Sequence, residues 1–169
     1  MADKYVALAD GRLITRAGTA ASAGSADAGK IVALESDGRL SPSVLPGGIG
    51  ADTVSRVASE TLAAGDLVNI WNDAGTPKMR KADAAAAGKE CSAFVKDAVS
   101  AGQTGLAYSE GSITGLTGLT PGARCYLGTT PGQITMTPPV ATGNVVQFVG
   151  TAHGADILSF EPGDGVVLG

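Results

Sequence analysis

The chain has 169 residues, 25 of them glycine and 8 proline, with 44% hydrophobic residues, 17% charged residues and a net charge of −4. The glycine content is above the average for soluble domains, but no Gly-x-y repeat of the collagen type occurs. The chain is too apolar and too weakly charged to be disordered throughout, and no apolar run reaches the roughly 18–20 residues of a membrane span.

The acidic balance, 16 acidic against 12 basic residues, argues against a nucleic-acid-binding surface, which needs clustered cations. The basic residues Lys78, Arg80 and Lys81 alternate with apolar neighbours, which indicates a strand with one solvated face. The first four residues lack the basic and apolar order of a secretory leader, so we expect no Sec-type export.

The first fifty residues differ in composition from the rest. Residues 17–29 (AGTAASAGSADAG) contain no large apolar side chain, which indicates a linker because little surface can be buried to offset its ordering entropy. Residues 4–13 and 30–40 echo one another: each is a short β-prone run followed by Asp-Gly and Arg-Leu, a hairpin signal. An isolated hairpin is marginal in water, so we expect these elements to pair with the body, a sister subunit or a partner.

A second set of breakers separates this region from the rest. Pro42, Pro46 and three glycines within residues 41–50 cannot continue a helix or a central strand. The sequence therefore predicts an extended Gly/Ala-rich N-terminal arm at 1–50 and a β-rich body at 51–169. Acidic and basic residues balance in the arm, five of each, so the whole net charge belongs to the body.

The body consists of short β-prone runs separated by Gly and Pro turns, at the spacing of an all-β fold. Only residues 82–89 (ADAAAAGK) favour a helix, of about two turns. The predicted fold is all-β, a small β-sandwich or barrel of short strands with an extended N-terminal arm. The predicted strands are residues 55–61, 67–71, 78–82, 92–99, 105–109, 124–127, 133–136, 145–152, 157–160 and 166–168.

The two cysteines, Cys91 and Cys125, form no CxxC pair. Without a secretory leader we expect two reduced thiols packed as small hydrophobic side chains, and a disulfide between them is the alternative. Together with His153 they lack the spacing of a metal site. We expect no metal and no cofactor.

The sequence contains no constellation that favours catalysis. His153 could act as a general base oriented by Asp156, but it ends a strand at a turn, no GxSxG motif occurs, and we interpret it as a turn residue. The glycines of residues 111–122 lack GxGxxG, Gly-Lys-Ser/Thr and a following helix, so we interpret this run as structural, held by Leu116 and Leu119. The scattered acids Glu60, Glu90, Glu110 and Glu161, and the aromatics Trp71, Tyr108 and Tyr126, are the remaining candidates.

Several segments carry a resemblance to a known class of protein. They are AAGDLVNI (63–70), LTGLTPGARCYL (116–127), VVQFVG (145–150) and ILSFEPGD (157–164), with GKIV (29–32) and GRLSPSVLP (38–46) in the arm. Together they span roughly residues 29–168 and resemble tailed-bacteriophage virion structural proteins, a group that includes capsid decoration (cement) proteins, head fibres and tail-associated modules.

The resemblance implies a non-enzymatic decoration protein that trimerises and binds the outside of the assembled head. Its partners would be the major capsid protein and other copies of itself, with no nucleic acid and no membrane. It would be made in the host bacterial cytoplasm and reside on the capsid surface of the virion. The residues expected to contact the capsid or another partner are the apolar side chains of the arm: Tyr5, Val6, Leu8, Leu13, Ile31, Val32, Leu34, Leu40 and Leu45.

Two alternatives make different predictions. A head-fibre or tail module that binds a host receptor or glycan would show an exposed aromatic patch around Trp71, Tyr108 or Tyr126. A glycan hydrolase would hold two of the four scattered acids roughly 5–10 Å apart in a cleft.

Overall fold

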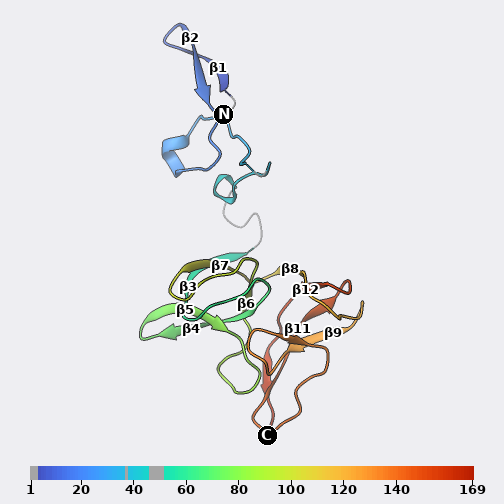
Figure 1. Cartoon of the computed structure of the whole chain (residues 1–169). Helices are drawn as coiled ribbons and strands as arrows, with labels where there is room; N and C mark the ends of the chain where they lie inside the picture. Colours follow the sequence, from blue (N-terminus) through green and yellow to red (C-terminus); the bar gives the residue numbers. More distant parts are fainter. Residues whose placement is uncertain (1–3, 37, 46–51) are drawn as a thin grey trace. The chain divides into compact units, whose positions relative to one another are not determined.

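The computed structural model describes residues 4–36, 38–45 and 52–169 (Figure 1). The chain divides into two compact units, Met1–Gly50 and Ala51–Gly169, which we call the arm unit and the body.

The arm unit begins with an antiparallel hairpin of β1 (Lys4–Ala9) and β2 (Arg12–Ala17). The two turn residues, Asp10 (φ 49°) and Gly11 (φ 72°), both adopt the positive φ that a two-residue type I′ turn requires. The hairpin predicted from the first Asp-Gly element is therefore confirmed.

The rest of the arm unit contains no further β-hairpin among its described residues. Residues 17–29, predicted to be a linker, instead fold into a loop that contains the short 3₁₀ helix η1 (Gly24–Asp27), and Thr19 forms an isolated parallel bridge with Val32. The second Asp-Gly element forms a turn in which the amide of Glu35 donates to the carbonyl of Arg39 over 2.8 Å. Its predicted hairpin is absent from the described residues, and Asp37 lies outside them. The short helix η2 (Pro42–Val44) follows.

The first half of the body is a closed five-stranded barrel in the order β3-β5-β4-β6-β7. Strand pairs are antiparallel except β3 with β5. The β4–β5 hairpin turns at Ala74 and Gly75, both with positive φ, which is one of the glycine-containing turns predicted between the strands. The strands are β3 (Thr53–Ala58), β4 (Leu67–Asp73), β5 (Thr76–Lys81), β6 (Ala93–Val95) and β7 (Thr104–Tyr108).

The second half is an antiparallel sheet in the order β10-β9-β11-β12-β8, and β13 pairs with the other end of β11. A β-bulge interrupts the pairing of β11 with β9 between Phe148 and Gly150. The strands are β8 (Gly111–Thr114), β9 (Arg124–Leu127), β10 (Ile134–Thr135), β11 (Val145–Ala152), β12 (Ile157–Phe160) and β13 (Gly165–Val167).

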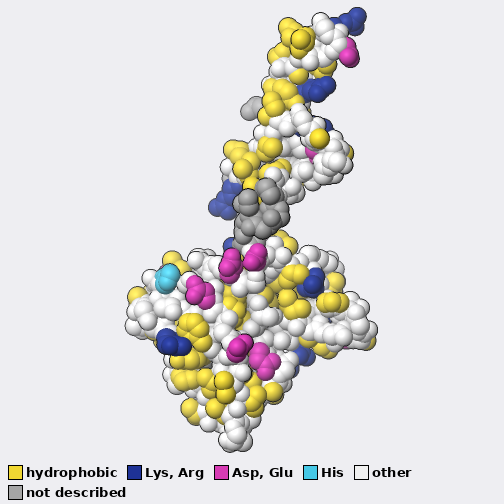
Figure 2. Space-filling view, turned by 180° about the vertical axis from the view of Figure 1, so that it is seen from behind, with side chains coloured by type: hydrophobic (Ala, Val, Ile, Leu, Met, Phe, Trp, Pro, Cys, Tyr) yellow, Lys and Arg dark blue, Asp and Glu magenta, His cyan; other side chains and the backbone are white. Residues whose placement is uncertain are grey.

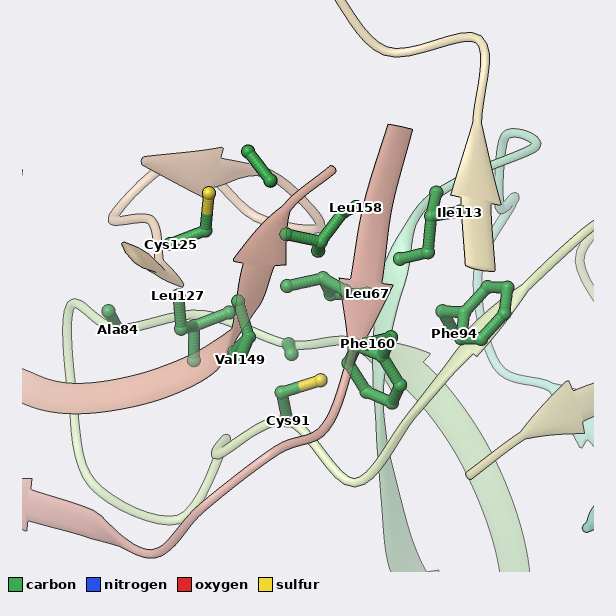
Figure 3. Close-up of a cluster of buried hydrophobic side chains, with 12 residues drawn as sticks. Leu67, Ala84, Cys91, Phe94, Ile113, Cys125, Leu127, Val149, Leu158 and Phe160 are labelled. Carbon is green, nitrogen blue, oxygen red and sulfur yellow. The ribbon is translucent and has the colours of Figure 1, made fainter. Parts of the chain in front are cut away.

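Two hydrophobic cores share β4 and β6 as a common wall. Along each strand successive side chains point to opposite faces. Val68 therefore packs inside the barrel while its neighbour Leu67 packs against the sheet, and Phe94 of β6 also packs on the sheet side. Figure 3 shows Leu67 and Phe94 close to Leu158 and Phe160 of β12.

Buried Gln147 of β11 joins the sheet to the loop before β6. Its Oε1 accepts a hydrogen bond from the amide of Cys91 at 2.7 Å, and its Nε2 donates to the carbonyls of Cys91 and Gly163, both at 2.8 Å. The carbonyl oxygen and the amide nitrogen of the Gln147 side chain are therefore both hydrogen-bonded, which offsets the cost of removing them from water.

The all-β prediction is confirmed, but the helix predicted at residues 82–89 is wrong. Ala82 and Ala84 are both buried in the core, and their amides donate to the carbonyls of Leu67 and Gly128, not to a preceding helical turn. Burial of these two alanines and backbone bonding to segments outside the run have outweighed the helix propensity of alanine. Strand β8 lies within the glycine-rich segment, where no strand was predicted.

Candidate partner-binding surface

The β1–β2 hairpin has one face formed mainly by aliphatic side chains. The register opposes Val6 to Thr15 and Leu8 to Leu13, so these four side chains share a face. Val6, Leu8 and Leu13 are 65%, 72% and 76% exposed. The hairpin thus presents an apolar face that nothing in the described residues of the arm unit covers.

The same exposure extends to the rest of the arm unit. Of the nine residues predicted to contact a partner, all lie within the described residues; eight are exposed, and Tyr5 is half-buried. Hydrophobic side chains accordingly appear on the surface of the arm unit in Figure 2. The exposed members beyond the hairpin are Ile31, Val32, Leu34, Leu40 and Leu45.

The arm unit has little buried interior of its own among its described residues. Ser41 is the one residue there whose described side chain is buried. Its hydroxyl lies 2.9 Å from that of Ser43, which in turn accepts a hydrogen bond from the amide of Ser22 at 2.8 Å. Both hydrophobic cores consist of body residues. The described arm therefore buries apolar side chains such as Tyr5, Ile14 and Val44 only in part and lacks the hydrophobic core of a self-sufficient domain.

Asp27 closes the η1 loop. Its carboxylate accepts hydrogen bonds from the ammonium group of Lys30 and from the amide of Ala23. These bonds, that of Lys30 first, hold the pKa of Asp27 below its ordinary value. A charged side chain thus contributes to the conformation of the loop.

The three aromatic candidates are half-buried, and each contacts a cation or another ring. The guanidinium of Arg80 lies 4.5 Å from the ring centroid of Trp71. Tyr108 stacks on Phe94 and also carries the ammonium group of Lys96 at 4.2 Å. The remaining one, Tyr126, packs edge-on against Phe148. These contacts leave the aromatic rings engaged with the body's own side chains.

The scattered acids serve local structure where their contacts are defined. Glu60 accepts a hydrogen bond from the amide of Lys81 at 2.9 Å, and Glu90 accepts one from the amide of Gly88 at 3.0 Å. Glu110 and Glu161 are exposed.

His153 is exposed in the turn between β11 and β12, and its amide bonds to the carbonyl of Ile157 at 2.9 Å. The interpretation of His153 as a turn residue is confirmed. Among the described residues, no hydrogen bond connects its ring to Asp156. Leu116 and Leu119, predicted to hold the glycine-rich run, pack against the core.

The basic cluster on β5 is neutralised locally, and its Met79 is buried inside the barrel as the alternation predicts. Lys78 pairs with Asp73 at 2.6 Å. Lys81 pairs at 3.2 Å with the buried carboxylate of Asp66, which also accepts a hydrogen bond from the amide of Ala63 at 2.8 Å. These cations are therefore engaged in intramolecular contacts.

Both cysteines are free, buried thiols, as expected. Burial raises the pKa of Cys91 to about 12 and also raises that of Cys125. Within residues 4–36, 38–45 and 52–169, no three His, Cys, Asp or Glu side chains gather as metal ligands would. None of the helices in those ranges has the length and apolar character needed to cross a membrane.

Sequence reasoning found the arm residues but missed the apolar end of the body around β13, where Val140, Val166 and Val167 are exposed. The strand itself was predicted at 166–168, yet no sequence signal indicates that both of its valines lack cover. Comparison with known proteins adds no assignment: no protein-family model matches the sequence, and no curated protein matches it significantly.

Proposed function

We propose that this chain is a non-enzymatic capsid decoration (cement) protein of a tailed bacteriophage, which trimerises and binds the outside of the assembled head. The arm unit holds the major capsid protein, and the body faces outward. The observation that supports this proposal is the lack of a hydrophobic core in the arm unit: eight of its aliphatic side chains are exposed, and none of its described apolar side chains is fully buried.

Binding would complete the arm unit by supplying the apolar contacts that it lacks. If each of the eight side chains gains roughly 1 kcal/mol on burial, the gross gain is on the order of 8 kcal/mol per arm. Association and side-chain ordering cost about 4–15 kcal/mol, so a single arm binds weakly. Linking three arms in a trimer makes the second and third attachments intramolecular and yields durable binding.

Stabilisation of the head then follows from mass action. A protein that binds the assembled shell and not its separated subunits shifts the equilibrium toward the shell, without any covalent chemistry.

The test is occupancy on purified virions of the phage that encodes the protein, measured by quantitative gel densitometry and native mass spectrometry. The triple variant Ile31→Ser, Leu34→Ser, Leu40→Ser should lower occupancy at least tenfold. A matched control, Leu106→Ser with Met136→Ser, removes exposed apolar side chains from the body and should leave occupancy unchanged.

Hundreds of copies per particle, in a simple ratio to the major capsid protein, are expected. A count of three, six or a dozen would overturn the decoration proposal and move the protein to a tail or vertex, where glycan binding becomes the function to test. Unchanged occupancy of the arm variant would refute the role of the arm.

A further inference from the structure

Strand β13 leaves an apolar edge uncovered on the body. Val166 and Val167 are 62% and 51% exposed although they lie in a strand paired with β11. Val140, in the loop before β11, is 86% exposed. This loop is tied to the residue after β13 by a hydrogen bond from the amide of Gly143 to the carbonyl of Leu168 at 2.8 Å.

The exposed apolar surface belongs to the edge of strand β13 and not to one face of the sheet. Successive residues in a strand project to opposite faces, so Val166 and Val167 point in opposite directions and yet both are exposed. Strand β13 pairs only with β11 among the described strands. Natural proteins usually blunt such edges with short strands, charges, proline or bulges; β13 is short, but its three residues, Gly165 and two valines, carry no charge and no proline.

The β1–β2 hairpin has the complementary features. It is a two-stranded sheet, so each of its strands also has an unpaired edge. Strand β2 carries Arg12 and Arg16 and no acidic residue, whereas the segment leading into β13 carries the exposed acids Glu161 and Asp164. Apolar side chains and opposite charges therefore occur together on the two edges.

We propose that β2 of one copy pairs edge to edge with β13 of a second copy, extending the body sheet by the two strands of the hairpin. Strand addition of this kind gains affinity from main-chain hydrogen bonds and specificity from alternate side chains. The contact is heterologous, because each copy donates one hairpin and offers one β13 edge; such contacts generate rings where the rotation between copies closes and open filaments where it does not. Closure at three copies rests on the proposed function; the pairing itself does not.

Disulfide trapping between separately purified variants tests the pairing without any virion. Leu13→Cys is mixed with Val166→Cys or Val167→Cys and oxidised with diamide. The expected product is a covalent heterodimer of two chains in at least one mixture. Native Cys91 and Cys125 are buried with raised pKa values, so they do not compete. Leu13→Cys mixed with Leu106→Cys, an exposed aliphatic position on β7, is the matched control and should give no covalent heterodimer.

The absence of a heterodimer from both mixtures would overturn the proposal. Cross-linking only within a single chain that carries both cysteines would equally overturn it, since the hairpin would then cover its own body. These outcomes leave virion occupancy untouched, so failure of the pairing is distinguishable from failure of the decoration function.

Charge exchange provides a second readout. Arg12→Glu with Arg16→Glu should weaken self-association about tenfold or more, measured by sedimentation velocity, because like charges would then meet at the edge. Adding Glu161→Lys and Asp164→Lys to the same chain should restore it. Self-association unaffected by the reversal, or not restored by the exchange, would contradict the pairing of β2 with β13.

Discussion

Replacing Gln147 by leucine should destabilise the body more than any other substitution of a single polar side chain discussed above. The exchange keeps the approximate volume of the side chain but removes three hydrogen bonds, to the amide and carbonyl of Cys91 and to the carbonyl of Gly163. Cys91 is buried, so its two main-chain groups have no access to water, whereas Gly163 is exposed and can be hydrated.

The magnitude follows from those two buried groups. Each unsatisfied group costs about 1–3 kcal/mol, and the added apolar burial of leucine offsets about 1–2 kcal/mol. The two groups together cost about 2–6 kcal/mol, so the net loss is at most about 5 kcal/mol, with a central value of about 2.5 kcal/mol. At roughly 4 °C per kcal/mol for a domain of this size, the central value lowers the melting temperature by about 10 °C.

Urea unfolding followed by tryptophan fluorescence and circular dichroism measures the loss. Gln103→Leu is the matched control: Gln103 is exposed and its side chain makes no hydrogen bond in the described structure, so its replacement should change stability by less than about 0.5 kcal/mol. Equal stabilities for the two leucine variants would refute the role assigned to Gln147.

The isosteric variant Gln147→Glu adds a pH signature. It keeps one oxygen as the acceptor for the amide of Cys91 but directs the other carboxylate oxygen, in place of Nε2, at the carbonyls of Cys91 and Gly163. Protonation restores one donor, so this variant should gain stability relative to the parent as the pH falls from 7 to 5. A difference that does not vary with pH would contradict the hydrogen-bond assignment.

Three further predictions concern the backbone and the titrating groups. Gly150→Ala should cost about 4 kcal/mol or more in unfolding free energy, because an added Cβ would lie 2.0 Å from the carbonyl oxygen of Ser159; Gly143→Ala, also at positive φ but with open space around it, should cost only about 1 kcal/mol, and equal losses would remove the steric argument. Burial raises the pKa of Cys91 from 9.0 to about 12, so the unfolded chain loses this proton first as the pH rises. Stability should therefore fall by up to about 1.4 kcal/mol per pH unit above pH 9. Urea unfolding between pH 8.5 and 10.5 should show a weaker dependence of unfolding free energy on pH for Cys91→Ala, and an unchanged dependence would refute this linkage. The pKa of Asp27 is lowered, so its contribution to the η1 loop is present above about pH 4 and lost as the pH falls through the folded-state value. Below that pH the loop should open and the amide of Ala23 should lose its protection, so that its exchange approaches the intrinsic rate. In the Asp27→Asn variant the protection of this amide should not change with pH.

The turns of this protein could be predicted because their geometry depends on a few local residues. Asp10-Gly11 and Ala74-Gly75 both lie at positive φ, and glycine in the second position is the visible signal in each. The same signal failed for the second Asp-Gly element, where Val32 bridges with Thr19 instead of with a strand after the turn. Whether such a turn leads into a hairpin depends on pairing partners that are distant in sequence.

The helix predicted at residues 82–89 failed for a related reason. A run of alanines has the highest helix propensity, but alanine is also small enough to fill tight core positions between strands. Ala82 and Ala84 fill such positions, which depend on Leu67 and Gly128, contributed by segments far away in the chain.

Only part of the candidate surface could be predicted from the sequence. The sequence identifies the aliphatic residues of the arm, because a segment without large apolar side chains separates them and cannot cover them. The β13 edge could not be identified, since the exposure of both valines depends on β13 having a neighbour on one side only.

The wall shared by the two cores has a consequence for the genetic modularity of the body. A gene fragment that encoded only the barrel would leave Leu67 and Phe94 facing water, and one that encoded only the sheet would lack the side chains that complete its core. The body can therefore be inherited, shuffled or fused only as an intact block. Recombination events that preserve it must fall outside residues 53–167, or be insertions into its exposed loops.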